Sequence, residues 1–244
     1  MDPADRLCSH SYRPQPLIIV RFSALGFDID HTLGIDNKLE RVAFLHLLEE
    51  ICAQGGHALG TLDQESVAID KLLAAHRSGA FSIDEAVNRF VAARGVPRSD
   101  AWLRRYKEMV LENVDHFFIP QPDASFVLKE LDTRRIPCAV LSNGWSPLQQ
   151  RKAERVSFRG PVLVSDMLGV QKPQAAAFLA LARALEREPA AVAFVGDNPI
   201  DDIDAAQRAG MPAIWFDAEG ERYPGELAAP DAVIHRLAEL LAFL

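Results

Sequence analysis

Short runs of consecutive apolar residues alternate with helical segments throughout the second half of the chain. These runs, and an earlier one, are the predicted strands: Leu25–Phe27, Cys138–Leu141, Val162–Val164, Ala191–Val195 and Ala213–Phe216. Helical patterns predict the helices that separate and follow them, over 123–134, 147–156, 174–186, 200–209 and 235–243. A strand that is apolar along its whole length is buried on both faces, as in a parallel sheet covered by helices. The sequence therefore predicts an α/β fold with a Rossmann-like parallel sheet core and helices on both faces.

The stretch after the first strand has helical signals without strand signals. Asn37 with Glu40, and Ser82 with Glu85, resemble capping boxes, which satisfy free backbone N–H groups at the start of a helix. Glycines follow the periodic segments and are expected to end them. We therefore predict an α-helical cap inserted into the core. The predicted divisions are a leader over 1–16, the α/β core over 17–34 and 118–244, and the helical cap over 35–117.

Charge and composition narrow the classes of partner. The 244 residues carry a formal net charge of -8 and contain no block of lysine and arginine, which argues against nucleic acid or a membrane surface as the partner. No segment is long and apolar enough to be predicted as a membrane span. The three cysteines are widely spaced, a pattern that predicts buried free thiols and a reducing compartment. We expect a cytoplasmic monomer or homodimer that acts on a small molecule.

Polar residues stand where the predicted strands end. Asp28 and Asp30 follow the first strand, Ser142 follows the second, and Asp197 follows a later one. Ligands bind beyond the carboxyl ends of the strands in an open parallel sheet. We therefore expect these sequence-distant side chains to meet in one pocket, with Thr32 fixing the turn beside them.

These residue types suit phosphoryl transfer. One carboxylate of the Asp28–Asp30 pair can attack phosphorus, while the other protonates the leaving group and later activates water. Ser142 and the backbone amides from Asn143 onward can hold phosphoryl oxygens. Lys172 can neutralise the attacking carboxylate and the transferred charge. Each motif alone is more typical of a turn, a cap or a surface lysine, so the indication comes from their combination.

The densest acidic cluster follows the strand at 191–195 and comprises Asp197, Asp201, Asp202 and Asp204. Two of these carboxylates with Asp28 would form the oxygen-rich site that Mg²⁺ prefers. Acidic residues are also favoured at the start of a helix by its dipole, and this alternative covers Asp201 and Asp204 well. It explains Asp197 less well, because that residue comes directly after a strand.

The motifs together resemble those of the haloacid dehalogenase-like hydrolase superfamily, over essentially all of residues 24–244. The residues that carry the resemblance are Phe27-Asp28-Ile29-Asp30-His31-Thr32-Leu33, Leu141-Ser142-Asn143-Gly144, Gly169-Val170-Gln171-Lys172-Pro173, and Val195-Gly196-Asp197-Asn198-Pro199-Ile200-Asp201-Asp202-Ile203. Gln150 with Lys152 also matches the usual flank of the second motif. The resemblance implies that the inserted helices form a mobile cap that selects the substrate.

The resemblance also implies a role for each matching residue. Asp28 would be the nucleophile, and Asp30 the general acid and base. Lys172 would hold the phosphoryl group against Asp28. The phosphoryl oxygens would be bound by Ser142, Asn143, Thr32 and Lys172. Mg²⁺ would be bound by Asp28, the backbone carbonyl of Asp30, Asp197 and a second acidic residue, for which Asp202 fits the family spacing better than its rival Asp201.

The implied activity is Mg²⁺-dependent hydrolysis of a small phosphorylated metabolite through an aspartyl-phosphate. Dehalogenating members lack the second aspartate of the first motif, so Asp30 argues against carbon–halogen chemistry. A phosphomutase of the same fold and a catalytically silent binding module are the alternatives. The family often has Gly or Asn where His31 stands; we expect this histidine at the hinge of the cap, with contact to the substrate as the alternative. The cations of the cap are expected to form a solvated helix face, with substrate recognition as the alternative: Arg77, Arg104, Arg105 and Lys107.

Overall fold

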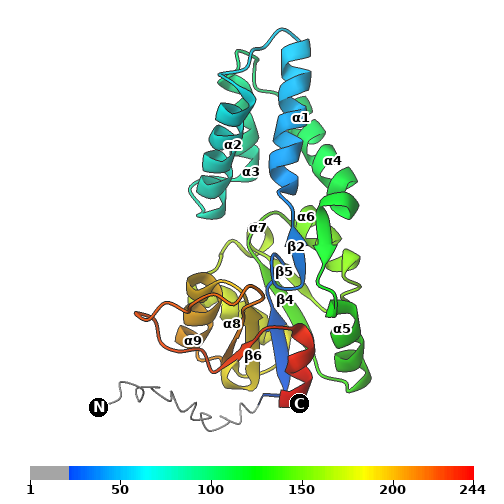
Figure 1. The fold of residues 1–244 in the computed structure, drawn as a ribbon, viewed down its shortest axis with the longest axis vertical. Helices are drawn as coiled ribbons and strands as arrows, with labels where there is room; N and C mark the ends of the chain where they lie inside the picture. Colours follow the sequence, from blue (N-terminus) through cyan, green and yellow to red (C-terminus); the bar gives the residue numbers. More distant parts are fainter. Residues whose placement is uncertain (1–21) are drawn as a thin grey trace, which may run out of the picture.

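A computed structural model describes residues 22–244, and the predicted leader and the apolar run at 18–20 lie outside them. Its centre is a six-stranded sheet in which every pair of neighbours is parallel, in the order β5-β4-β1-β6-β7-β8 (Figure 1). The strands are β1 (Ala24–Phe27), β4 (Cys138–Ser142), β5 (Val162–Val164), β6 (Val192–Gly196), β7 (Ala213–Phe216) and β8 (Ala232–Ile234). The prediction of an α/β fold with a parallel sheet is confirmed.

Helices cover both faces of this sheet. One face packs against α5 (Ala124–Thr133), α6 (Ser146–Arg155) and the 3₁₀ helix η3 (Leu237–Phe243). The other packs against α8 (Ala175–Ala184) and α9 (Ala205–Arg208). Successive side chains of a strand point to opposite faces, so neighbours such as Phe194 and Val195 enter different cores. This is the physical reason why the strands carry apolar residues on both faces.

A separate group of helices lies beyond the carboxyl ends of the strands (Figure 1). It consists of α1 (Leu39–Ala53), α2 (Leu62–Arg77), α3 (Ile83–Ala92) and α4 (Asp100–Phe117). Two short antiparallel strands, β2 (Gly34–Asp36) and β3 (Phe118–Pro120), connect this group to the core. Both connections between the helices and the sheet therefore run through one narrow strand pair.

The starts of these helices correct one prediction. Ser82 Oγ accepts the backbone N–H of Glu85 at 3.2 Å, as predicted. The capping box of Asn37 with Glu40 is wrong: the N-cap is Lys38, in a left-handed conformation, and the backbone N–H of Leu39 donates instead to Asp36 Oδ1 at 2.9 Å. The strand pairing of β2 extends through Asp36 and brings its carboxylate to the start of the helix, which local sequence signals do not reveal.

Several short elements were not predicted. Besides β2, β3 and β8, these are the one-turn helix α7 (Ser165–Leu168) and the 3₁₀ turn η1 (Pro189–Ala191). The helix expected over 200–209 is divided into a wide π-type turn η2 (Pro199–Asp204) followed by α9, and the C-terminal helix is the 3₁₀ helix η3. These segments are too short for a periodic pattern to emerge.

Two further observations concern the surface. Cys52 and Cys138 are free thiols, but Cys52 is exposed and Cys138 only partly buried, so the prediction of buried thiols is wrong for these two. Cys52 lies near the end of α1, on the side of the helix that faces away from the core. Among the described helices, none combines the length and the apolar character needed to cross a membrane.

Candidate active site

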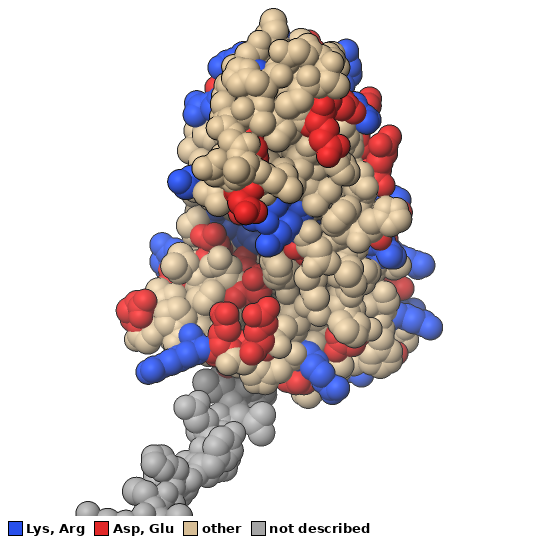
Figure 2. Space-filling model, turned by 45° about the horizontal axis from the view of Figure 1, so that its top comes forward, with Lys and Arg blue, Asp and Glu red and all other residues tan. Residues whose placement is uncertain are grey.

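A cavity of about 640 Å³ lies between the carboxyl edge of the sheet and helices α1 and α2. Asp28 follows β1, Ser142 ends β4 and Asp197 follows β6, and all three line this cavity. Figure 2 shows basic side chains gathered in the hollow between the helices and the sheet, above a group of acidic side chains. The parallel arrangement thus brings together residues that are far apart in the sequence, as expected from their positions at strand ends.

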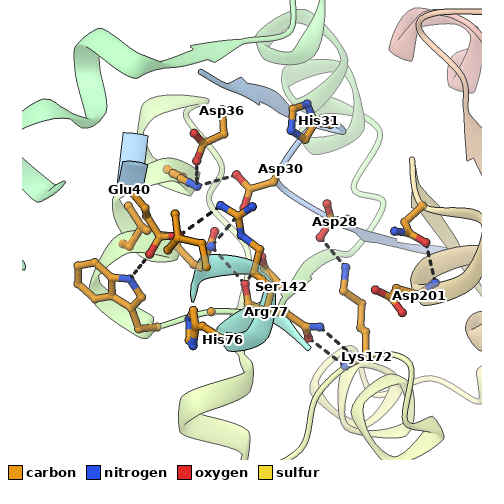
Figure 3. Close-up of a pocket in the computed structure, with 18 of the residues that line it drawn as sticks. Asp28, Asp30, His31, Asp36, Glu40, His76, Arg77, Ser142, Lys172 and Asp201 are labelled. Atoms are coloured by element: carbon orange, nitrogen blue, oxygen red, sulfur yellow. Dashed lines mark hydrogen bonds and ion pairs between the residues drawn. The ribbon is translucent and has the colours of Figure 1, made fainter. Parts of the chain in front are cut away.

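Lys172 is a buried cation in the wall of this cavity, beside Asp28 (Figure 3). Its ammonium group lies 2.5 Å from Asp28 Oδ1 and 2.6 Å from Asp202 Oδ1, and all three side chains are buried. Burial alone would lower the pKa of Lys172, but the charges of Asp202 and Asp28 outweigh it and raise the pKa, so the ammonium stays protonated.

The loop that carries Lys172 is held by the side chain of Asn143. The Asn143 amide accepts the backbone N–H of Lys172 and donates to the backbone carbonyl of the same residue, each at 2.9 Å. This reciprocal pair links the loop after β4 to the loop before α8. Asn143 therefore fixes the backbone from which the lysine reaches Asp28.

The turn η2 brings Asp202 into the site. The side-chain oxygen of Asn198 accepts hydrogen bonds from the backbone N–H groups of Ile200 and Asp201. The backbone N–H of Asn198 donates to Asp202 Oδ2 at 3.0 Å. Asp202 is buried, whereas Asp201 is partly exposed at the wall of the cavity. A side chain at Gly196 would collide with the Asp202 carboxylate, so the end of β6 has room for glycine alone.

The acidic residues form a cluster with the donor set of a hard cation. One carboxylate oxygen each from Asp28, Asp197 and Asp202 lies within 4.8 Å of the others. Burial, together with the neighbouring carboxylates and against the charge of Lys172, raises the pKa of Asp28 well above its ordinary value. Burial and the charge of Asp202 raise the pKa of Asp197 to about 6. Ionised carboxylates in this arrangement repel one another, and a divalent cation bound by their oxygens would relieve that repulsion, so the residues fit Mg²⁺.

Asp30 lies in a different environment, set by residues of α6. Lys152 Nζ is 2.7 Å from Asp30 Oδ1 and 2.6 Å from Asp36 Oδ2, and the lysine side chain is only 2% exposed. Gln149 Nε2 donates to Asp30 Oδ2 at 3.3 Å. Burial would raise the pKa of Asp30, but the charge and hydrogen bond of Lys152 and the hydrogen bond of Gln149 lower it overall. The Asp28 and Asp30 carboxylates, two positions apart in the sequence, thus have pKa values shifted in opposite directions.

Thr32 and His31 occupy positions beside the cluster. Thr32 is fully buried and its hydroxyl donates to Asp197 Oδ1 at 3.2 Å. This placement favours orientation of Asp197 over the direct phosphate contact expected from the sequence. His31 is exposed, lies in the turn before β2 in a left-handed conformation, and lines the cavity.

The structure also places in the site residues for which the sequence predicted no role. Lys152 was noted only as a match to a motif flank, and Gln149 and Asp36 carried no signal. Gln149 and Lys152 lie three positions apart on α6, a spacing that places both on one face of a helix. That spacing is the one local signal that could have indicated them together.

Comparison with known proteins identifies the family of this chain. The model of the haloacid dehalogenase-like hydrolase family matches residues 22–210. The chain belongs to this family. A solved structure of a 2-haloacid dehalogenase from Pseudomonas syringae is 26% identical, with a TM-score of 0.69, over 91% of this chain and 97% of that one.

Curated relatives of this hydrolase include named phosphatases. A phosphoserine phosphatase of Thermus thermophilus is 34% identical over 122 residues, which are 49% of each chain. A glyceraldehyde 3-phosphate phosphatase of Pyrococcus furiosus is 24% identical over 237 residues, which are 92% of this chain and 93% of the relative. The chain thus spans about half the length of the first relative and nearly all of the second.

Proposed function

We propose that this family member is a Mg²⁺-dependent phosphatase that hydrolyses a small phosphorylated metabolite through an aspartyl-phosphate on Asp28. The observation that carries the proposal is the buried Lys172 ammonium, 2.5 Å from Asp28 and 2.6 Å from Asp202, beside the cluster completed by Asp197. This arrangement offers a nucleophile, a fixed cation and a set of oxygen ligands at one edge of a sheet. The named phosphatases among the relatives support the same class of reaction.

In the first half-reaction a carboxylate oxygen of Asp28 forms a bond to phosphorus, and the bond from phosphorus to the ester oxygen breaks. The proton of Asp30 passes to that oxygen, which leaves as an alcohol. The charge of an arriving phosphate opposes ionisation of Asp30, because a nearby anion raises the pKa of a carboxyl group. Lys172 and Ser142 hold the phosphoryl oxygens while charge moves onto them.

In the second half-reaction the oxygen of a water molecule forms a bond to phosphorus, and the bond from phosphorus to Asp28 breaks. Asp30 takes the proton of the water, and inorganic phosphate leaves. The pairing of Asp30 with Lys152 favours the ionised carboxylate that this step needs. The two steps regenerate both carboxyl groups in their starting forms.

Asp28, Asp197 and Asp202, with the backbone carbonyl of Asp30, are the groups that would hold Mg²⁺. When bound, the ion offsets the charge of the carboxylates and of the phosphoryl oxygens. Thr32 orients Asp197 and Asn143 orients Lys172. Residues 35–117 act in this proposal as the cap that covers the site, excludes water and selects the substrate.

The test is phosphate release from a panel of phosphorylated metabolites, with Mg²⁺, with EDTA and with the Asp28→Asn variant. We expect release that requires both the metal and Asp28, with a loss of at least about 10³-fold in the variant, since removal of a covalent nucleophile can lower kcat by up to about 10⁶-fold. Transfer of the phosphoryl group to a second hydroxyl in place of water would instead indicate a mutase. Release that persists in Asp28→Asn would contradict the proposed intermediate.

A further inference from the structure

The four cations singled out in the helical group differ in their surroundings. Arg105 pairs with Glu50 and Lys107 with Asp84, each at 2.8 Å, and Arg104 is exposed on α4. None of these three lines the catalytic cavity. Arg77, the last residue of α2, does line it, together with Asp28 and Lys172. Arg77 is exposed, as expected of a solvated helix face, but unlike the other three it lines the cavity, so the alternative of substrate recognition applies to it alone among the four.

A buried carboxylate orients the Arg77 guanidinium. Glu40 Oε2 lies 3.5 Å from Arg77 Nη2, and the Glu40 side chain is only 8% exposed. Glu40 Oε1 accepts hydrogen bonds from Tyr106 Oη at 3.2 Å and from Trp145 Nε1 at 3.3 Å. Glu40 is thus fixed by residues of α4 and of the loop after β4, and it gives Arg77 a rigid anchor at the wall of the cavity.

The guanidinium has donors to spare. Arginine presents five N–H donors, and one carboxylate contact at 3.5 Å leaves most of them unused. The other paired cations of the cavity are engaged at shorter distances: Lys172 with Asp28 and Asp202, Lys152 with Asp30 and Asp36, and Arg41 with Asp70. The Arg77 side chain is 60% exposed, so a ligand entering the cavity can reach it.

The position of Arg77 relative to the reacting groups sets what it can contact. Figure 3 shows it between Glu40 and Asp30, on the side of the cavity away from Lys172. In the proposed reaction the phosphoryl group lies against both Asp28 and Lys172, and the ester oxygen faces Asp30. The carbon skeleton of the leaving group would therefore extend toward Arg77.

We propose that Arg77 binds a second anionic group of the substrate, a carboxylate or a second phosphate carried close to the ester oxygen. This inference rests on the proposed phosphatase function and narrows its substrate class to phosphate monoesters with an additional oxyanion. A guanidinium recognises carboxylate and phosphate through the same pair of parallel N–H donors, so both groups fit the site. A neutral sugar phosphate would leave those donors without an anionic partner.

The test compares matched esters in the wild type and in Arg77→Met. Phosphoglycolate and ethyl phosphate differ in a carboxylate, and ethylene glycol bisphosphate and 2-hydroxyethyl phosphate differ in a second phosphate. We expect the wild type to prefer the anionic member of at least one pair, and Arg77→Met to lower that preference in kcat/KM on the order of 10- to 100-fold, mainly through KM. The pair that responds identifies the second group. Arg104→Met, an exposed change on α4, serves as the control and should keep the preference of the wild type.

The ratio between the members of a pair is the decisive readout, because loss of a charge near Asp30 would slow both members equally. Equal kcat/KM for both members in the wild type, or an equal loss for both in Arg77→Met, would overturn the inference. Calorimetric binding of the same esters to Asp28→Asn, with and without Arg77→Met, measures the preference without turnover. Arg77-dependent binding in a protein that hydrolyses no ester would refute the phosphatase and retain the anion site, whereas binding without a preference would refute the anion site.

Discussion

Replacement of Lys152 by methionine should destabilise the protein strongly, since Lys152 is a buried cation shared by two carboxylates. Its ammonium lies 2.7 Å from Asp30 and 2.6 Å from Asp36. Methionine has a similar length and fills the space, so the main effect is electrostatic. The Asp36 side chain is 10% exposed and the Asp30 side chain 31% exposed, so the stranded Asp36 charge is the costlier one.

Removal of one partner from a buried ion pair costs about 3–5 kcal/mol. In the variant, Asp30 can be hydrated, and Asp36 keeps its hydrogen bond from the backbone N–H of Leu39. We therefore expect the free energy of unfolding to fall by about 3 kcal/mol, near the lower limit. The assay is urea unfolding at pH 7, followed by tryptophan fluorescence. Arg151→Met, an exposed neighbour on the same helix whose ion pairs are with Asp115 and Glu154, should cost about 0–1 kcal/mol.

A second variant separates charge from packing. Adding Asp36→Asn to Lys152→Met removes the stranded carboxylate, while the amide oxygen can still accept the N–H of Leu39. We expect the double variant to be more stable than Lys152→Met, because the two changes act on one ion pair and are not additive. A loss below about 1 kcal/mol in Lys152→Met, or a double variant less stable than the single one, would refute this reasoning.

Three further predictions concern the metal site and the helical group. Burial and the charge of Asp202 raise the pKa of Asp197 to about 6. Because this pKa lies above that of the unfolded chain, the contribution of Asp197 to the free energy of unfolding without metal falls as the pH rises from about 4 to 6. Mg²⁺ needs the ionised form, so the thermal shift caused by Mg²⁺ should grow through the same range, and a shift independent of pH would contradict this. Gly196→Ala should displace the Asp202 carboxylate and weaken Mg²⁺ binding measured by calorimetry, whereas unchanged affinity would show that the loop can yield. Arg94→Met should leave the buried Glu65 carboxylate unpaired and cost about 3–5 kcal/mol in urea unfolding, with a loss under about 1 kcal/mol as the contrary result.

The main strands and long helices were predictable because their signals are local. Continuous apolar runs such as Val192–Val195 are required when both faces of a strand are buried, and this requirement appears directly in the sequence. The pair β2 and β3 was not predictable, since strands of three residues at 34–36 and 118–120 are paired across the whole helical group. That pairing also places Asp36 at the start of α1, which is why the capping box expected at Asn37 does not form.

The sequence by itself determined which chemistry-bearing residues gather at the edge of the sheet. Asp28, Ser142 and Asp197 stand at the carboxyl ends of three strands, and parallel strands bring those ends to the same edge. The partner of each side chain was decided only by the tertiary structure. The turn η2 directs Asp202, rather than Asp201, toward Lys172, and the packing of α6 places Lys152 against Asp30. Arg77 meets Glu40 because two helices pack together above the sheet. Such contacts depend on how elements distant in sequence pack and rotate against one another, and a local pattern of residue types carries no record of that geometry.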